Sequence, residues 1–259
     1  MTIRVGVLGA AGRMGATVCD AVDADPDLSL VAAFDPNAES GQSTHGVSVS
    51  TSLDEVIAAA LDVVVDFTIA DAARANLPRI AAAGIHAVVG TTGFDDADMA
   101  SLGAAFSAES GAHCLVAANF AISAVLMMRF AELAAPFFES GEVIELHHEN
   151  KIDAPSGTAA ATLDRMAAAS SDWIDDPTEH EVYPGARGGS GPAGIRVHSV
   201  RMRGMVAHQE VILGAVGQSL TIRQDSYDRT SFMPGVVLAC KRIADHPGLT
   251  VGLDPYLEI

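Results

Sequence analysis

Cysteine is scarce in this 259-residue sequence, and the few cysteines are far apart with no CxxC spacing. An odd, scattered set argues against a disulfide framework or a zinc site and fits a reducing cytoplasm. The first residues lack the basic region and long apolar run of a signal peptide. The longest apolar run, Phe120–Met128, is too short to span a bilayer, so we expect a cytoplasmic protein without a membrane partner. The cysteines are Cys19, Cys114 and Cys240.

Positive charge is scarce as well, because 15 Lys and Arg stand against 33 Asp and Glu, a formal net charge of −18. A nucleic-acid binder needs a basic surface, which argues against that class of protein. A dianionic substrate would meet an unfavourable long-range field, so any site for one must be locally positive. With 49% hydrophobic and 19% charged residues, the chain fits a soluble globular protein of one large or two modest domains.

In the first half of the sequence, short β-branched runs alternate with Ala-rich helical segments. This alternation predicts an α/β domain with a Rossmann-like parallel sheet covered by helices on both faces. Ser52 and Glu55 have the spacing of a capping box. The predicted strands are Ile3–Leu8, Leu28–Phe34, Val63–Phe67, His86–Val89 and His113–Ala117, and the predicted helices are Arg13–Ala24, Ser52–Ala60, Ala70–Ala83 and Asp95–Ser110.

The pattern changes after Asn119, where two helices and several strands joined by short turns predict a second, α+β domain with a mixed or antiparallel sheet. We therefore expect a dinucleotide-binding domain over 1–120, a substrate-binding and oligomerisation domain over 121–228, and a segment 229–259 that packs back onto the first. The Gly- and Pro-rich stretch 183–194 is interpreted as a solvent loop rather than a lid. The predicted elements are helices Ala121–Phe138, Ser156–Ala169 and Ser231–Ala244, with strands Val143–His147, Ile195–Met202, His208–Leu213, Leu220–Arg223 and Leu249–Leu253.

A glycine-rich turn follows the first predicted strand and opens a helix, with the spacing GxxGxxG from Gly9 to Gly15. Gly9 permits a tight turn, Gly12 lets the backbone approach a pyrophosphate, and the helix N-terminus favours an anion. Asp35 ends the second predicted strand twenty positions later and is placed to bind an adenosine ribose. The alternative is a glycine-rich turn without a ligand. The candidate cofactor residues here are Gly9, Ala10, Ala11, Gly12, Arg13, Met14 and Asp35.

Small and hydroxyl residues follow two further predicted strands, at the ends where doubly wound sheets bind ligands. Such residues would allow a nicotinamide ribose to approach closely, although Gly-Thr turns are common in themselves. The candidate cofactor residues at these ends are Gly90, Thr91 and Thr92, and Ala117, Ala118, Asn119 and Phe120.

The stretch from Glu145 to Ala159 places two imidazoles and an ammonium, those of His147, His148 and Lys151, just before a predicted helix start. The first backbone N–H groups of that helix, at Gly157 and Thr158, would be available to an anion. The segment is thus a locally cationic pocket in an acidic protein and suits a substrate with carboxylates. A metal site is disfavoured, because adjacent histidines on a strand point to opposite faces and no HExxH spacing occurs.

Taken together, these segments resemble the dihydrodipicolinate reductase (4-hydroxy-tetrahydrodipicolinate reductase) family over essentially the whole chain. The longest matching run is His147-His148 followed by Lys151-x-Asp153-Ala154-Pro155-Ser156-Gly157-Thr158-Ala159. The other matching motifs, in the same order and spacing, are the Gly9–Gly15 loop, Gly90-Thr91-Thr92-Gly93, Asn119-Phe120 and Asp228-Arg229-x-x-Phe232.

The resemblance implies an enzyme that transfers hydride from NADH or NADPH to a small cyclic dicarboxylate imine, yielding tetrahydrodipicolinate for diaminopimelate and lysine synthesis. It implies His147 as proton donor or acceptor, Lys151 as general acid, and His148, Gly157 and Thr158 as carboxylate ligands. It also implies a homotetramer built through the second domain. Because no arginine follows Asp35 to receive a 2′-phosphate, we expect NADH to serve at least as well as NADPH.

Two alternatives remain open from the sequence. Another Rossmann dehydrogenase, acting on an amino-acid semialdehyde or a sugar, would share the first domain but would not need the cationic segment 147–158. A non-catalytic nicotinamide sensor would bind NADH and turn over nothing.

Overall fold

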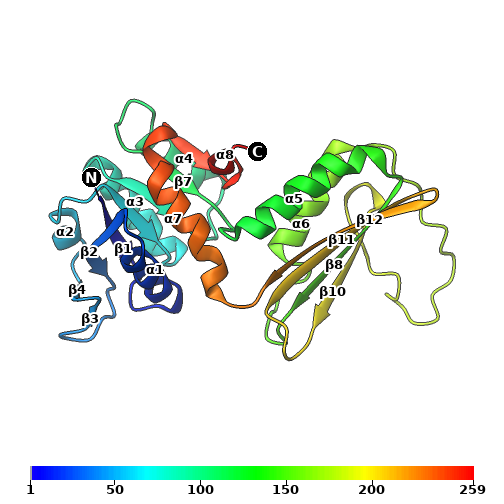
Figure 1. The fold of residues 1–259 in the computed structure, drawn as a ribbon, viewed down its shortest axis with the longest axis horizontal. Coiled ribbons are helices and arrows are strands. Elements are labelled where there is room, and N and C mark those ends of the chain that lie inside the picture. The colour runs from blue at the N-terminus through cyan, green and yellow to red at the C-terminus, as the bar shows by residue number, and fades with distance from the viewer. Residues whose placement is uncertain (1) are drawn as a thin grey trace. The chain divides into compact units, whose positions relative to one another are not determined.

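A computed structural model describes residues 2–259 and divides the chain into two compact units (Figure 1). The first unit holds the residues up to Ala121 together with Arg229–Ile259, and the second is Ile122–Asp228. These bounds differ by one residue from the division expected at 120 and 121 and coincide with the division expected at 228 and 229. Both units combine helices with a sheet, so the α/β class with a second α+β unit is confirmed.

The first unit contains one sheet with the strand order β13-β7-β6-β5-β1-β2-β4-β3, in which every pair is parallel except β3 with β4. Its central strands are apolar and buried because helices cover both faces. The strands are β1 (Ile3–Leu8), β2 (Leu28–Phe34), β3 (Ser43–Thr44), β4 (Val47–Ser50), β5 (Val63–Asp66), β6 (His86–Val89), β7 (Cys114–Val116) and β13 (Leu249–Val251).

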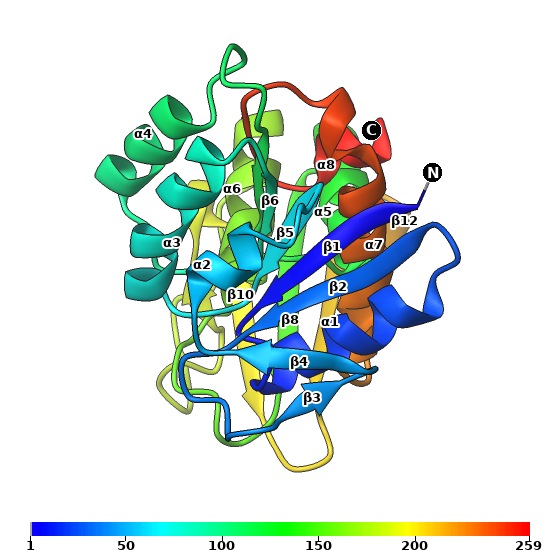
Figure 2. The same cartoon turned by 90° about the vertical axis from the view of Figure 1, so that its left-hand side faces the viewer.

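Helices α1 and α7 cover one face of this sheet, and α2, α3 and α4 cover the other (Figure 2). The C-terminal segment joins the same layers, since α7 packs against α1 and β13 pairs with β7. The helices are α1 (Arg13–Ala24), α2 (Leu53–Ile57), α3 (Ala70–Ala82), α4 (Asp96–Ala105), α7 (Met233–Arg242) and α8 (Asp254–Leu257), with short 3-10 turns at Arg229–Phe232 and Ile243–Asp245. Strands β3 and β4 and helix α8 were not predicted.

The expected capping box at Ser52 is wrong. The Ser52 side chain caps nothing, and Glu55 instead accepts a hydrogen bond from Ser50 Oγ at 2.6 Å. The residues that do form a capping box are Asp95 and Asp98, each of which accepts the backbone N–H of the other at the start of α4. Spacing alone therefore did not decide which hydroxyl the glutamate bonds.

Two predicted helices end earlier than their composition indicated. Helix α4 ends at Ala105 and not at Ser110, because Phe106 leaves the helical conformation and is fully buried in the core. In the second unit, α5 (Ile122–Ala134) gives way to a 3-10 turn around Pro136, whose ring has no N–H to continue the helix.

The second unit packs α5 and α6 on one face of a five-stranded sheet with the order β12-β11-β8-β10-β9 (Figure 1). The sheet is mixed, because β10 runs parallel to β8 while the other pairs are antiparallel. This confirms the mixed or antiparallel prediction. Its elements are β8 (Ser140–His147), α6 (Gly157–Ala169), β9 (Gly189–Ser190), a 3-10 turn at Pro192–Gly194, β10 (Arg196–Arg201), β11 (Ala207–Ala215) and β12 (Gln218–Ser226).

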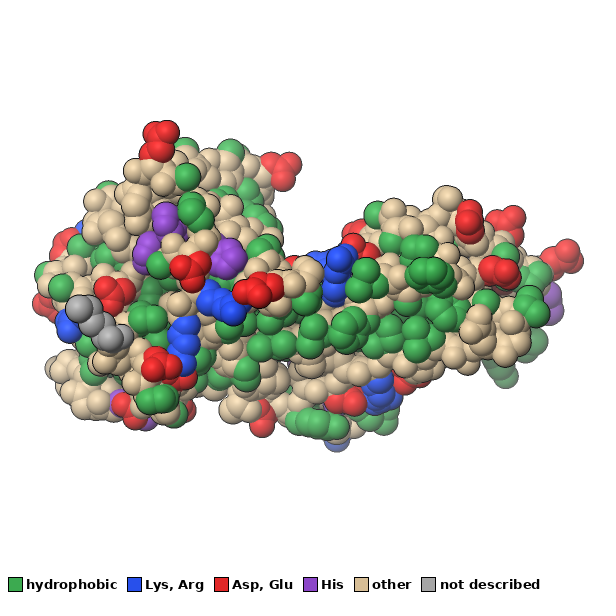
Figure 3. All heavy atoms as spheres, turned by 45° about the horizontal axis from the view of Figure 1, so that its top comes forward, with side chains coloured by type: hydrophobic (Ala, Val, Ile, Leu, Met, Phe, Trp, Pro, Cys, Tyr) green, Lys and Arg blue, Asp and Glu red, His purple; other side chains and the backbone are tan. Residues whose placement is uncertain are grey.

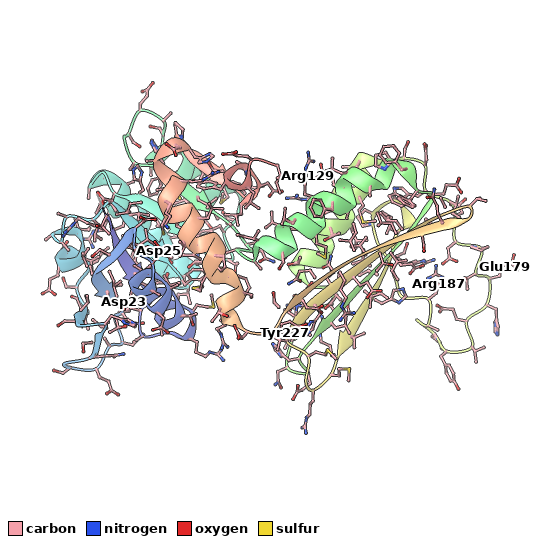
Figure 4. All side chains as sticks on the ribbon, in the orientation of Figure 1. Asp23, Asp25, Arg129, Glu179, Arg187 and Tyr227 are labelled. Carbon is pink, nitrogen blue, oxygen red and sulfur yellow. The ribbon has the colours of Figure 1, made fainter. Side chains whose placement is uncertain are left out.

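The long connection between α6 and β10 is held to the sheet of its own unit by Arg187. The guanidinium contacts Glu142 of β8 at 2.5 Å and Asp176 at 3.2 Å, and Figure 4 shows Arg187 between the connection and the sheet. Within residues 2–259, no helix is long and apolar enough to cross a membrane.

Candidate active site

The glycine loop of the first unit admits no side chain at two of its glycines. Gly9 has a φ of +82°, and a Cβ there would lie 2.8 Å from the carbonyl oxygen of Phe67. A Cβ on Gly15 would lie 2.0 Å from the carbonyl oxygen of Gly9. The loop can therefore fold back against β5 and the start of α1 only with glycine at both positions.

Backbone hydrogen bonds fix this loop to the end of β2. The N–H groups of Gly9 and Ala10 donate to the Phe34 carbonyl at 2.8 and 3.0 Å. The N–H of Ala11 donates to Asp35 Oδ2 at 3.2 Å, which places the buried Asp35 carboxylate directly beside the loop. Each carboxylate oxygen can accept a further bond, so Asp35 retains acceptors for ribose hydroxyls.

The turn after β6 is supported from beneath by a residue that the sequence analysis gave no role. The Asp66 side chain, at the end of β5, is fully buried, and its Oδ1 accepts hydrogen bonds from Thr68 and from Thr91 Oγ1, the latter at 2.7 Å. Burial raises the pKa of Asp66, and the bonds from both threonines oppose that rise. A Cβ on Gly90 would lie 2.1 Å from the Phe67 ring, so this turn also requires a glycine.

The segment after β7 forms the next part of the same edge. Ala117 donates its N–H to Val89 at 3.0 Å, and Asn119 Oδ1 accepts the N–H of Ala121 at 2.8 Å. The ring of Phe120 is buried, and its centroid lies 5.9 Å from that of Phe67.

The predicted cofactor residues therefore gather along the carboxyl ends of four parallel strands. These strands, β2, β1, β6 and β7, lie in one sheet with β5 between the second and third. Three positions too tight for a Cβ, an uncapped helix start and a ribose-facing carboxylate together fit the pyrophosphate and ribose of a dinucleotide. Of these residues, Ala11, Gly12, Arg13, Thr92 and Ala118 are exposed.

In the second unit, the cationic segment runs from the end of β8 to the start of α6. His147 is the last residue of β8, and Ser156 is the N-cap of α6, accepting the N–H of Ala159 on its Oγ at 3.2 Å. Gly157 and Thr158 are the first two residues of the helix, as expected. Their N–H groups precede the first intrahelical hydrogen bonds, and the helix dipole is positive at this end.

Glu145 lies at the centre of this segment and is fully buried. Arg201 of β10 donates two hydrogen bonds to the carboxylate, at 2.7 and 2.8 Å. His147 Nδ1 lies 2.5 Å from Oε2, and the N–H of Ser156 donates to Oε1 at 3.2 Å. One carboxylate thus joins β8, β10 and the helix start.

The remaining predicted residues lie on the loop between β8 and α6. Lys151 Nζ contacts Asp153 Oδ1 at 2.9 Å, and the N–H of Lys151 donates to the carbonyl of His148 at 3.2 Å. Arg201 also donates to the carbonyl of Asp153 at 2.7 Å, so the same guanidinium holds both Glu145 and the loop. His148 lies outside β8 and is exposed. Within residues 2–259, no cluster of three His, Cys, Asp or Glu could hold a metal ion.

Two family models together match nearly the whole chain: dihydrodipicolinate reductase N-terminus over residues 3–120, and dihydrodipicolinate reductase C-terminus over residues 123–257. The chain belongs to the dihydrodipicolinate reductase family. The first unit is accordingly a nucleotide-binding Rossmann domain, and NAD(P)H is the cofactor class.

Full-length relatives of this reductase family include the 4-hydroxy-tetrahydrodipicolinate reductases of Beutenbergia cavernae and Corynebacterium aurimucosum. Each is 51% identical, with 100% of both chains covered. A solved dihydrodipicolinate reductase from Paenisporosarcina sp. TG-14, with dipicolinate bound, is 37% identical, with a TM-score of 0.90, and the match covers 98% of this chain and 99% of that one. GenD2 in complex with NAD shares the fold alone, with 16% identity, a TM-score of 0.66, and 99% of this chain and 90% of that one covered.

The charge states in this reductase's second unit follow from the contacts of Glu145. Burial would raise the pKa of Glu145, but hydrogen bonds, above all those from Arg201, outweigh burial and hold that pKa below its usual value. Burial lowers the pKa of His147, and the hydrogen bond to Glu145 only partly offsets this. Near neutral pH, the site therefore contains a carboxylate and a neutral imidazole.

The sequence analysis missed Glu145 and Arg201 as site residues. Glu145 carried a signal, because residues two apart on a strand share a face and Glu145 precedes His147 by two. Arg201 carried none, since only the pairing of β10 with β8, with Arg201 opposite His147, brings it to the site from more than fifty residues away.

Proposed function

We propose that this chain uses NAD(P)H to reduce 4-hydroxy-tetrahydrodipicolinate, or the dihydrodipicolinate formed from it, to tetrahydrodipicolinate in the diaminopimelate route to lysine. One observation carries the proposal: an imidazole, an ammonium and a helix start are joined around Glu145 in a chain of net charge −18. Family membership and the names of the full-length relatives agree with it.

We assign the proton chemistry to Lys151 and His147. The nicotinamide cofactor supplies a hydride when bound, and a conjugated imine that accepts this hydride must also gain a proton. The Lys151 ammonium is a donor within the segment, and neutral His147 can accept a proton on Nε2 while Nδ1 remains bonded to Glu145. Lys151 therefore acts as the general acid and His147 as its proton partner.

We assign the substrate carboxylates to His148, Gly157 and Thr158. The start of α6 presents backbone N–H groups and the positive end of a 13-residue helix dipole. His148 is exposed on the loop that leads to this helix start. The solved relative with bound dipicolinate, a planar dicarboxylate, is consistent with this kind of ligand.

We assign the cofactor to the residues along the carboxyl ends of β1, β2, β6 and β7, and we propose that NADH serves at least as well as NADPH. The carboxylate of Asp35 lies 3.2 Å from the Ala11 N–H, where a ribose bound beside the loop would meet it. A 2′-phosphate would be repelled there, and the exposed Arg13 is the one nearby cation in the sequence.

One assay tests the function. NADH consumption is measured with freshly made product of the preceding synthase, with aspartate semialdehyde and sugars as control substrates. We expect rapid oxidation with the synthase product alone. Turnover of a control substrate instead would favour a different dehydrogenase activity, and NADH binding without turnover would favour a sensor.

We also propose that the protein is a homotetramer assembled through the second unit. Helices α5 and α6 cover one face of its sheet, while the opposite face carries the half-buried side chains of Ile144, Leu146, Val200 and Ile212. Figure 3 shows further hydrophobic side chains along this unit. Sedimentation equilibrium should give four times the chain mass, and Ile212→Glu should lower it; a monomeric wild type would contradict the proposal.

We place the reaction in the reducing cytoplasm. All three cysteines are free and buried, and burial raises the pKa of the Cys19 thiol to about 11, so no reactive thiolate needs an oxidising compartment.

A further inference from the structure

The hydrogen bonds around Glu145 determine which nitrogen of His147 carries a proton. An ionised carboxylate can only accept hydrogen bonds, so each of its partners must donate. His147 Nδ1 lies 2.5 Å from Glu145 Oε2 and must therefore carry a hydrogen. In a neutral imidazole, the other nitrogen, Nε2, is then left with its lone pair.

The same carboxylate also holds the loop that carries Lys151. Glu145 Oε1 accepts the N–H of Ser156, the N-cap of α6, and Arg201 spans Glu145 and the carbonyl of Asp153. The Lys151 ammonium is in turn paired with the Asp153 carboxylate at 2.9 Å. Both ends of the loop are therefore fixed by one buried ion pair.

We propose that Glu145, clamped by Arg201, is a positioning residue that holds His147 in the Nδ1–H tautomer and leaves Nε2 as the proton acceptor of the reaction. The inference deepens the proposed function and rests on it for the catalytic consequence, but the tautomer itself is a property of the resting protein. Arg201 contributes a planar fork that binds both carboxylate oxygens, which a lysine could not do.

Strand β8 provides a matched control on its other face. Glu142 contacts His198 Nε2 at 2.7 Å and Arg187 at 2.5 Å, so it also joins a histidine to an arginine. It differs in being about one-third exposed and three residues from Glu145, with none of the proposed substrate residues among its contacts. Glu142→Gln thus removes a comparable charge from the same strand without touching His147.

The test compares Glu145→Gln with Glu142→Gln in the full-length chain. In wild type, ¹⁵N spectra of histidine-labelled protein, assigned with His147→Asn, should show His147 protonated on Nδ1. In Glu145→Gln, the amide can donate to Nδ1, so the signal should move toward the Nε2–H tautomer. We expect kcat to fall roughly 10²- to 10⁴-fold with a much smaller change in KM, because the acceptor nitrogen is lost. Glu142→Gln should change neither reading.

The pH profile supplies a second reading. The Glu145 hydrogen bond raises the pKa of His147 against the effect of burial, so its removal should move the acid limb of kcat to lower pH. Glu145→Asp, which keeps a carboxylate, should restore part of kcat and the wild-type tautomer. A wild-type spectrum with His147 protonated on Nε2, or equal losses of kcat in the two glutamine variants, would overturn the inference. An inactive wild type with the Nδ1–H tautomer would instead overturn the proposed function alone.

Discussion

The two units prepare for their ligands by different means. In the first unit, the loop from Gly9 to Gly15 works by the absence of side chains, since a Cβ on Gly15 would lie 2.0 Å from a carbonyl oxygen. In the second unit, charged side chains do the work, with Glu145 and Arg201 fixing His147. Steric changes in the first unit should therefore impair cofactor binding, and charge changes in the second should impair the proton chemistry.

The largest expected effect tests this division directly. Lys151→Ala and His147→Ala should each lower kcat roughly 10²- to 10⁴-fold, because each removes a group that gives or takes the proton. NADH affinity should remain near the wild-type value, because both residues belong to the second unit. Steady-state kinetics and NADH titration by fluorescence measure the two quantities separately.

The double variant Lys151→Ala/His147→Ala sharpens the assignment. Its loss of kcat should be smaller than the product of the single losses, since residues that act as a unit are non-additive. A fully multiplicative loss would separate the two residues into independent roles. A large loss of NADH affinity in either single variant would break the comparison between the units.

The next effect belongs to the first unit. Gly15→Ala forces a Cβ against the Gly9 carbonyl and should destabilise the protein by about 1–3 kcal/mol, with a loss of NADH affinity. Gly103→Ala in α4 is the matched control, because its Cβ would meet only Leu249 at 3.7 Å. That change should be neutral or stabilising by up to about 1 kcal/mol, since alanine is the better helix residue. Thermal unfolding distinguishes the two, and similar midpoints would contradict the steric argument.

How far sequence could predict this molecule depended on whether the signal was local. Strands Ile3–Leu8 and His86–Val89 and helix Arg13–Ala24 were predicted to the residue, because continuous apolar runs and glycine punctuation mark them. The two-residue strand Ser43–Thr44 carries no such run. Arg201 reaches Glu145 through strand pairing, which no periodicity within β10 reveals.

A smaller effect concerns cofactor choice. Asp35→Ala should weaken NADH roughly 10- to 100-fold, the range expected when a charged hydrogen-bond acceptor is lost. NADPH should be weakened less, because the same carboxylate repels the 2′-phosphate. The ratio of kcat/KM for the two cofactors measures this, with Asp54→Ala, an exposed carboxylate on α2, as control. A strong NADPH preference in wild type would contradict the role assigned to Asp35.

The anion site at the start of α6 should show a still smaller effect. Thr158→Val keeps the side-chain shape and removes the hydroxyl, so KM for substrate should rise by about fivefold to tenfold, as for one hydrogen bond. NADH affinity should be unchanged. Pyridine-2,6-dicarboxylate should compete with substrate in wild type and bind more weakly when Gly157 is replaced by a bulky residue. Equal inhibition of that variant would reject the site.

The smallest effect is a pH dependence of stability confined to the first unit. His86 Nδ1 accepts the N–H of His113 at 2.9 Å, and the two rings lie 4.8 Å apart, so His86 must stay neutral to keep this bond. Burial lowers the pKa of His86 and the neighbouring His113 lowers it further, while Asp62 opposes them.

The sign follows from proton linkage. The folded pKa of His86 lies below the ordinary value of 6.5, so the unfolded chain binds more protons as the pH falls past that value. The contribution of His86 to stability is therefore complete above about pH 6.5 and is lost as the pH falls toward the folded pKa. His45 gives a control of opposite sign, because its hydrogen bond to Asp20 raises its pKa and stabilises the fold at low pH. Unfolding midpoints between about pH 7 and pH 5 should fall less steeply in His86→Gln and more steeply in His45→Gln than in wild type. A His86→Gln curve parallel to wild type would show that the pair does not titrate with folding.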